Sequence, residues 1–228
     1  MIRQLAFDLP LAAAMGRADF IVSDANAEGL RSMDGWRDWP RGRMLLIGPP
    51  GAGKTHLARI WAQDRGASVV TVADLLSRNP PQIAAPNAVA VEDCDSLGAL
   101  PEAQTGLFHL YNLLDQQGGT LLLTARTPPR DWGLALPDLS SRMQSVAQTR
   151  LAAPDDVLLS AVLIKLFADR QVPVPPTLIP YLLPRMERSF SAARTLVAAL
   201  DSEALARRCP VTRSLAASLL DKDQTDSA

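Results

Sequence analysis

Residues 48–56 are the most informative segment of the chain, because they contain the phosphate-binding pattern G-x-x-x-x-G-K-[ST]. In such loops the backbone N–H groups point at a phosphate, and the helix that follows directs its positive end at the same anion. Lys54 is expected to neutralise the β- and γ-phosphates, and Thr55 to ligate Mg²⁺. The segment therefore predicts a P-loop; a Gly/Pro turn that carries Lys and Thr by chance is the alternative.

A second acidic element follows at residues 89–93, where the apolar run Val-Ala-Val ends in Glu92 and Asp93. A P-loop protein needs such acids at a strand end to hold Mg²⁺ and to polarise water. Glu92 stands at the metal-side position, where Asp is usual, and Asp93 at the water-orienting position. The alternative is a solvated strand end that happens to carry two charges.

Three arginines stand where they could meet phosphate oxygens. Arg126 follows a strand predicted at 120–124, and it either reaches a phosphate or is a surface charge. Arg142 lies on a short helix from which it could enter the nucleotide site of a neighbouring subunit. Its alternative is a surface arginine paired with Asp138 at i, i+4. Arg194 lies near the start of a later helix and could act in cis, or be simply a solvated helical arginine.

The elements that must position these side chains alternate between strand and helix up to residue 152. This alternation predicts an α/β fold, a parallel sheet with crossover helices flanking it. Apolar residues at i, i+3, i+4 spacing predict that the helix near 104–117 packs on the core. The predicted strands are 43–47, 68–72, 88–92 and 120–124, and the predicted helices include 26–33, 54–65 and 104–117.

The pattern becomes helical after Pro154, with helices expected at 155–171, 176–187, 191–208 and 211–220. This change predicts a P-loop α/β domain followed by a small all-helical lid domain. The expected divisions are an N-terminal segment at 1–17, the α/β domain at 18–152, the lid at 153–221 and a flexible tail at 222–228.

Composition narrows the class of protein. The 228 residues are 47% hydrophobic, which suffices for one large core or a core plus a small satellite. The net charge of −1 gives no global basic field for nucleic acid, so DNA contact is expected to be local or indirect. Cys94 and Cys209 follow no metal-ligand spacing, and no signal peptide or membrane span is visible. A reduced, cytoplasmic protein without membrane contact is expected.

Together these motifs resemble the DnaA family of AAA+ replication initiators over roughly residues 15–220. The resemblance implies a bound ADP or ATP with Mg²⁺, Arg142 as an arginine finger and Arg194 as the sensor II arginine. Arg126 falls where an acidic sensor I residue is common. The matching segments are the P-loop at 48–56, the Walker B strand at 89–93, the sensor I strand at 121–129, the finger segment at 136–143 and the sensor II helix at 194–200.

Within that family the chain looks like the Hda regulators of DnaA. The helix-turn-helix domain of DnaA is expected to be absent after Ala228. The N-terminus instead reads Gln-Leu-Ala-Phe-Asp-Leu at 4–9, which is similar to the motif that binds the DNA polymerase sliding clamp. An extended peptide of this kind would dock through the apolar anchors Leu5, Phe7 and Leu9, while Gln4 hydrogen-bonds in a small pocket.

The resemblance implies a regulator of replication initiation that binds the sliding clamp and stimulates ATP hydrolysis by DnaA, with weak or absent ATPase activity of its own. A self-contained AAA+ ATPase, such as a helicase or transposase loader in a homo-oligomer, is the first alternative. A DNA-binding initiator fragment is the second. The residues expected to contact nucleotide are Ile21, Val22, Pro49, Pro50, Gly51, Ala52, Gly53, Lys54, Thr55, His56 and Arg194.

Overall fold

Five parallel strands form a single sheet in the order β2-β3-β4-β1-β5 in the computed structural model, which describes Arg17 and residues 20–225. The order places β1, which leads into the P-loop, between β4 and β5. This arrangement confirms the predicted α/β fold with a parallel sheet. The strands are β1 (Arg43–Ile47), β2 (Ser68–Thr71), β3 (Ala88–Glu92), β4 (Thr120–Ala125) and β5 (Ala147–Arg150).

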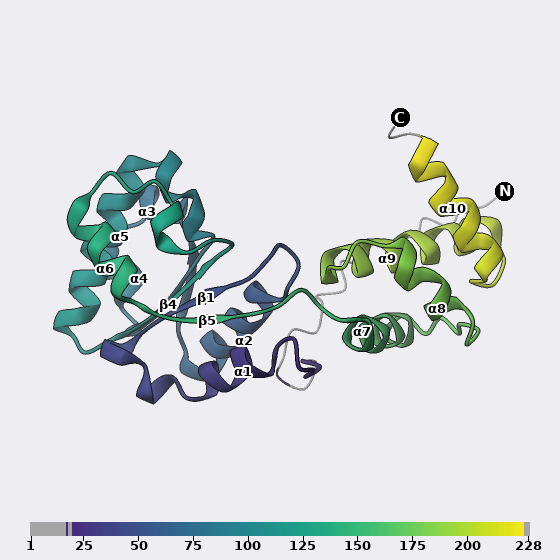
Figure 1. The fold of residues 1–228 in the computed structure, drawn as a ribbon, viewed down its shortest axis with the longest axis horizontal. Coiled ribbons are helices and arrows are strands. Elements are labelled where there is room, and N and C mark those ends of the chain that lie inside the picture. The colour runs from purple at the N-terminus through teal and green to yellow at the C-terminus, as the bar shows by residue number, and fades with distance from the viewer. Residues whose placement is uncertain (1–16, 18–19, 226–228) are drawn as a thin grey trace, which may run out of the picture.

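Helices cover both faces of the sheet (Figure 1). Alternate residues of β1 show why: Leu45 and Ile47 join one apolar cluster, while Met44 and Leu46 join another on the opposite face. Successive strand side chains point to opposite faces, so strands covered on both faces must be apolar throughout. The helices of this domain are α1 (Ala27–Asp34), α2 (Lys54–Arg65), α3 (Asp74–Ser77), α4 (Pro80–Ala84), α5 (Pro101–Gln116) and α6 (Pro137–Ser145).

A second, helical unit follows β5 and has an apolar core of its own, as expected for the lid (Figure 1). The connection to it is anchored twice. The Leu151 N–H donates to the Ile47 carbonyl at 2.8 Å, and the Ala152 N–H donates to the Ala25 carbonyl at 3.1 Å. The lid helices are α7 (Asp156–Asp169), α8 (Leu178–Leu182), α9 (Phe190–Arg207) and α10 (Arg213–Thr225).

Several elements differ from the sequence prediction: α3 and α4 were not predicted, and α5 begins at Pro101, before the predicted start at 104. β5 was not predicted, because its Ala-Gln-Thr-Arg sequence buries only Thr149 and the strand pairs with β1 alone. α8 is shorter than the predicted helix at 176–187, and a 3₁₀ turn at Leu183–Arg185 follows it. α10 continues to Thr225, past the predicted end of the lid at residue 221. Among the described residues, no helix is both long enough and apolar enough to cross a membrane.

Candidate functional site

The P-loop lies between the end of β1 and the start of α2, as the sequence predicted. Gly51 and Gly53 have φ angles of +70° and +95°, in the left-handed region where residues with a Cβ are strained. With the two glycines in this conformation, the loop leads into α2, which begins at Lys54 directly after Gly53. The positive end of a twelve-residue helix therefore lies at the loop, where it favours an anion.

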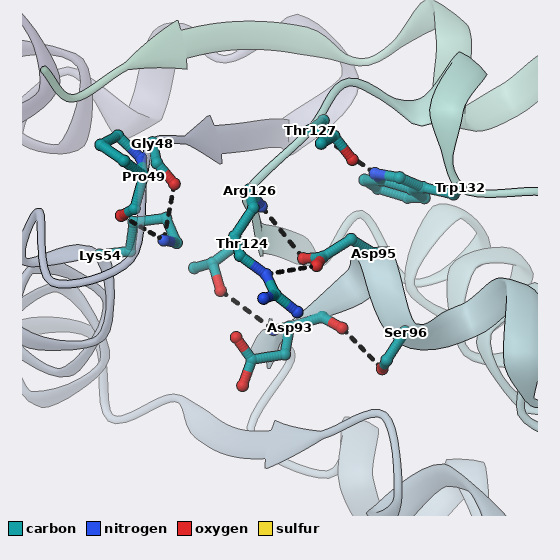
Figure 2. Close-up of polar contacts among 10 residues, drawn as sticks. All are labelled: Gly48, Pro49, Lys54, Asp93, Asp95, Ser96, Thr124, Arg126, Thr127 and Trp132. Carbon is teal, nitrogen blue, oxygen red and sulfur yellow. Dashed lines mark hydrogen bonds and ion pairs between the residues drawn. The ribbon is translucent and has the colours of Figure 1, made fainter. Parts of the chain in front are cut away.

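The Lys54 side chain reaches back over this loop (Figure 2). Its Nζ donates hydrogen bonds to the carbonyl of Gly48 at 2.8 Å and to that of Pro49 at 3.0 Å. Lys54 is 8% exposed, and burial lowers the pKa of its ammonium, against the opposing effect of the Asp93 and Asp95 charges. The ammonium is thus held at the loop among oxygen acceptors, in a position to meet phosphate oxygens.

The acids predicted at the end of β3 adopt two different environments. Glu92 is 7% exposed, and its buried Oε1 has no hydrogen-bond partner among the described residues. Asp93 is exposed and has a φ of +58°; its N–H donates to the Thr124 hydroxyl at 3.2 Å. A buried acceptor without a donor is costly unless a cation or a proton satisfies it, so Glu92 suits a metal-side role.

Arg126, at the tip of β4, is engaged with Asp95 (Figure 2). The Asp95 carboxylate accepts from the Arg126 backbone N–H at 3.0 Å and from its Nε at 2.7 Å. Burial raises the pKa of Asp95, but the two hydrogen bonds and the charge of Arg126 outweigh it, so the pKa lies below its ordinary value. Asp95 therefore competes with any phosphate for this guanidinium. The sequence prediction did not include Asp95 or Thr124.

The lid reaches the P-loop directly, through Ser189 and Phe190 at the start of α9. The Phe190 N–H donates to the Gly51 carbonyl at 3.0 Å, and Ser189 is only 1% exposed. A Cβ on Gly51 would lie 2.2 Å from the Ser189 Cβ, and a Cβ on Gly53 would lie 3.0 Å from the Phe190 ring. The sequence prediction missed this pair; its only signal was Ser189, an N-cap residue type ahead of a helical run.

Arg194 lies one turn further along α9 than Phe190 and is half-buried. The lid contact therefore brings the predicted sensor II helix to the P-loop, as a cis role requires. Within the described part of the chain, no hydrogen bond or ion pair engages the Arg194 side chain.

Phe20, which the sequence prediction did not include, contacts α2 from the N-terminal side. The Phe20 ring meets His56 edge-on, with ring centroids 5.4 Å apart. Asn26 fixes the segment before α1, because its Nδ2 donates to the Ile21 carbonyl at 2.8 Å. Ile21 is half-buried and Val22 is exposed. The Phe20 contact thus brings this N-terminal segment to the first turn of α2.

The donor set fits a Mg²⁺–nucleotide. Among the residues that the structure describes, no group of three or more His, Cys, Asp or Glu could hold a metal ion by itself. Mg²⁺ in nucleotide sites takes few protein ligands and completes its shell with phosphate oxygens and water. The exposed Thr55 hydroxyl and the unsatisfied Glu92 oxygen match that need.

The predicted finger Arg142 contacts α5 rather than the P-loop residues described above. Arg142 lies on α6, with its guanidinium carbon over the rings of Phe108 and Tyr111 at 5.1 and 5.0 Å. In the described chain it forms no ion pair with Asp138, which the alternative interpretation had expected. The four predicted clamp-binding residues, Gln4, Leu5, Phe7 and Leu9, lie outside the described residues.

Comparisons with known proteins agree with the AAA+ fold. The model of the ATPase family associated with various cellular activities (AAA) matches residues 44–89, which include the P-loop. No curated protein matches the chain in sequence.

Several solved structures share the fold at low sequence identity. Domain III of the Thermotoga maritima replication initiation protein DnaA is 19% identical, with a TM-score of 0.80 over 94% of this chain and 98% of that one. AMPPCP-bound DnaA from Aquifex aeolicus is 17% identical, with a TM-score of 0.64 over 80% of this chain. The chain spans only 63% of that protein. Thermotoga maritima RuvB is 16% identical, with a TM-score of 0.65 over 90% of this chain and 70% of that one.

Proposed function

We propose that this chain is a nucleotide-binding AAA+ regulator of replication initiation, which binds the sliding clamp and stimulates ATP hydrolysis by DnaA. One observation carries the proposal. Arg142, the predicted finger, lies on α6 against the rings of Phe108 and Tyr111, and is paired with no carboxylate in the described chain. A guanidinium placed in this way is available to a nucleotide on another protein.

In this proposal the chain binds ADP or ATP at its own P-loop. Lys54 and the N-terminus of α2 hold the phosphates, and Thr55 and Glu92 hold Mg²⁺. A bound nucleotide would supply the phosphate oxygens that these groups hold. Arg194 would contribute a guanidinium from α9, and Ile21, Val22 and His56 would contribute to nucleotide binding from the N-terminal side.

The partner contacts follow from the N-terminal motif and from charge. Gln4, Leu5, Phe7 and Leu9 supply the anchors for the clamp, and through the clamp the chain comes to DNA indirectly. A net charge of −1 fits an indirect DNA contact. The function places the protein in the cytoplasm.

A self-contained ATPase, such as a helicase or transposase loader in a homo-oligomer, is the second candidate. Glu92 and Asp93 favour it, because both acids that hydrolysis requires stand at the end of β3. The two candidates differ in where hydrolysis occurs: on this chain's own nucleotide, or on the nucleotide of a partner.

Clamp binding is tested by a pull-down with purified sliding clamp. The full chain is expected to bind, and a chain without residues 1–9, or with Leu5→Ala and Phe7→Ala together, is expected to lose binding while circular dichroism stays unchanged. Val157→Ala, at an exposed apolar residue of α7 that belongs to no proposed site, serves as the control. Full binding by the truncated chain would refute the clamp assignment.

The regulatory role is tested by turnover of DnaA-bound ATP with clamp loaded on DNA. Arg142→Ala should bind ADP as the parent does but lose stimulation, since a guanidinium supplied in trans is worth about 10³–10⁵ in rate in other systems. Arg194→Ala should weaken this chain's own ADP binding. The control is Arg130→Ala, whose side chain is 78% exposed. Full stimulation by Arg142→Ala would favour the self-contained ATPase.

A further inference from the structure

The guanidinium of Arg142 lies against two aromatic rings of α5. Its central carbon lies 5.1 Å from the centre of the Phe108 ring and 5.0 Å from that of Tyr111. Both distances fall within the range of about 6 Å in which a cation is attracted to a ring face. We call Phe108 and Tyr111 together the aromatic shelf.

The shelf is rigid on the side of Tyr111, which is 2% exposed. Arg43, fully buried at the start of β1, lies 4.9 Å from the centre of the same ring. Arg43 is fixed in turn, because its Nη1 donates to the Gly119 carbonyl at 2.6 Å and its Nη2 to the Tyr111 carbonyl at 3.5 Å. The Tyr111 ring thus contacts two arginines, Arg43, which is buried and hydrogen-bonded, and Arg142, which is half-buried.

The rings restrain Arg142 without neutralising it. A carboxylate partner would cancel the charge of the guanidinium and compete with any incoming anion, whereas a ring face attracts a cation and leaves its N–H donors available. A free arginine side chain also loses rotamer entropy when it becomes ordered. Because Arg142 already contacts the aromatic shelf, part of this entropy is lost before a partner binds.

We infer that Phe108 and Tyr111 are positioning residues, which hold the charged guanidinium of Arg142 unpaired and ready for the polyphosphate of a nucleotide bound to a second protein. The inference rests on the proposed function, because it assigns Arg142 to a partner's nucleotide. It goes further by naming the residues that set the orientation of Arg142, and these residues contact no nucleotide themselves.

The first test needs no partner. In a ¹⁵N–¹H spectrum of arginine side chains, the Nε–Hε signal of Arg142, assigned with Arg142→Lys, is expected to be shifted upfield by the ring currents of the shelf. Phe108→Leu should move this signal towards the exposed arginines, and Phe108→Tyr should leave it in place. A signal that is unshifted in the parent protein, or unchanged in Phe108→Leu, overturns the shelf.

The second test measures turnover of DnaA-bound ATP. Phe108→Leu should lower the maximal stimulated rate about three- to tenfold, the size expected when one cation–π contact is lost, while ADP binding by this chain stays unchanged. Phe108→Tyr should restore the rate, and Thr105→Leu, at an exposed position of α5, should not alter it. If Phe108→Leu folds poorly, Phe108→Met, whose flexible side chain adapts to the space left by the ring, takes its place.

The two hypotheses fail in different ways. If Arg142→Ala stimulates turnover fully, the proposed function fails, whatever the spectrum shows. If Arg142→Ala abolishes stimulation but Phe108→Leu stimulates as well as the parent, Arg142 acts in trans and the shelf does not position it.

Discussion

The backbone N–H of Phe190 donates a 3.0 Å hydrogen bond to the carbonyl of Gly51, which ties the first residue of α9 to the middle of the P-loop. The bond uses the carbonyl of Gly51, whereas phosphate-binding loops use N–H groups, so lid contact and phosphate binding occupy different atoms of one loop. A change in the backbone of this loop would therefore shift the acceptor of the Phe190 hydrogen bond and so alter how the lid is attached.

Gly51→Ala should disrupt this contact. The new Cβ would lie 2.2 Å from the Ser189 Cβ, in a backbone at φ +70°, so either the loop or the lid must shift. We expect nucleotide affinity to fall at least tenfold by calorimetry.

The matched control is Gly66→Ala. Gly66 has a similar φ of +61° but no atom within 4 Å of the added Cβ, so it reports the cost of backbone strain alone. Equal effects of the two substitutions on nucleotide binding would show that the Ser189 contact does not matter.

Lys54→Ala should reduce ADP affinity by about a hundredfold or more, because the ammonium is a charge-assisted donor to phosphate. It should also loosen the loop, since Nζ bonds to the carbonyls of Gly48 and Pro49. Calorimetry with ADP measures the first effect and thermal unfolding the second. Lys165→Ala on the lid surface is the control, and unchanged ADP affinity in folded Lys54→Ala would disprove the P-loop assignment.

The strands around the P-loop could be predicted because the information is local. β1 and β3 are continuous apolar runs bounded by polar residues, so their limits agree with the structure to the residue. β5 could not be predicted, because a half-exposed edge strand of four residues leaves no periodic pattern. Its place depends on pairing with β1, which lies a hundred residues earlier in the chain.

Asp95→Asn should destabilise the protein in a pH-dependent way. The folded pKa of Asp95 lies below its unfolded value, so its stabilisation is present above about pH 4 and is lost as the pH falls through the folded pKa. Since Arg126 is largely exposed, the loss at pH 7 should be about 1 kcal/mol. Urea unfolding at pH 7 and near pH 2.5 should show the difference between parent and variant shrinking with acid; a constant difference would contradict the ion pair as its cause.

The two cysteines should react at very different rates. Cys94 is completely buried, and burial raises the pKa of its thiol, so little thiolate is available. Cys209 is partly exposed. With Ellman's reagent at pH 8, one thiol per chain is expected to react rapidly and the second only on unfolding. Cys209→Ser should remove the rapid phase; its persistence would place the reactive thiol at Cys94.

The site residues that lie within one continuous segment could be predicted from the sequence. Those whose role depends on contact between distant segments could not. The P-loop and the acids at 92 and 93 follow from spacing alone. Asp95 acquires its role only because β4 returns beside β3 and brings Arg126 to it. Ser189 contacts Gly51, although the two lie more than a hundred residues apart in the sequence. The contact leaves no room for a Cβ at position 51, and no local sequence pattern predicts it.

The lid segment leaves and returns to nearly the same place. It departs after Leu151, whose N–H is bonded to the last residue of β1, and it comes back at Phe190, bonded four residues further along at Gly51. Because the lid is attached at two points, it cannot rotate about a single hinge without breaking one of these hydrogen bonds. Residues 152–189 therefore form a closed loop on residues 47–51, and a displacement of α7 or α8 would act on that segment through both hydrogen bonds.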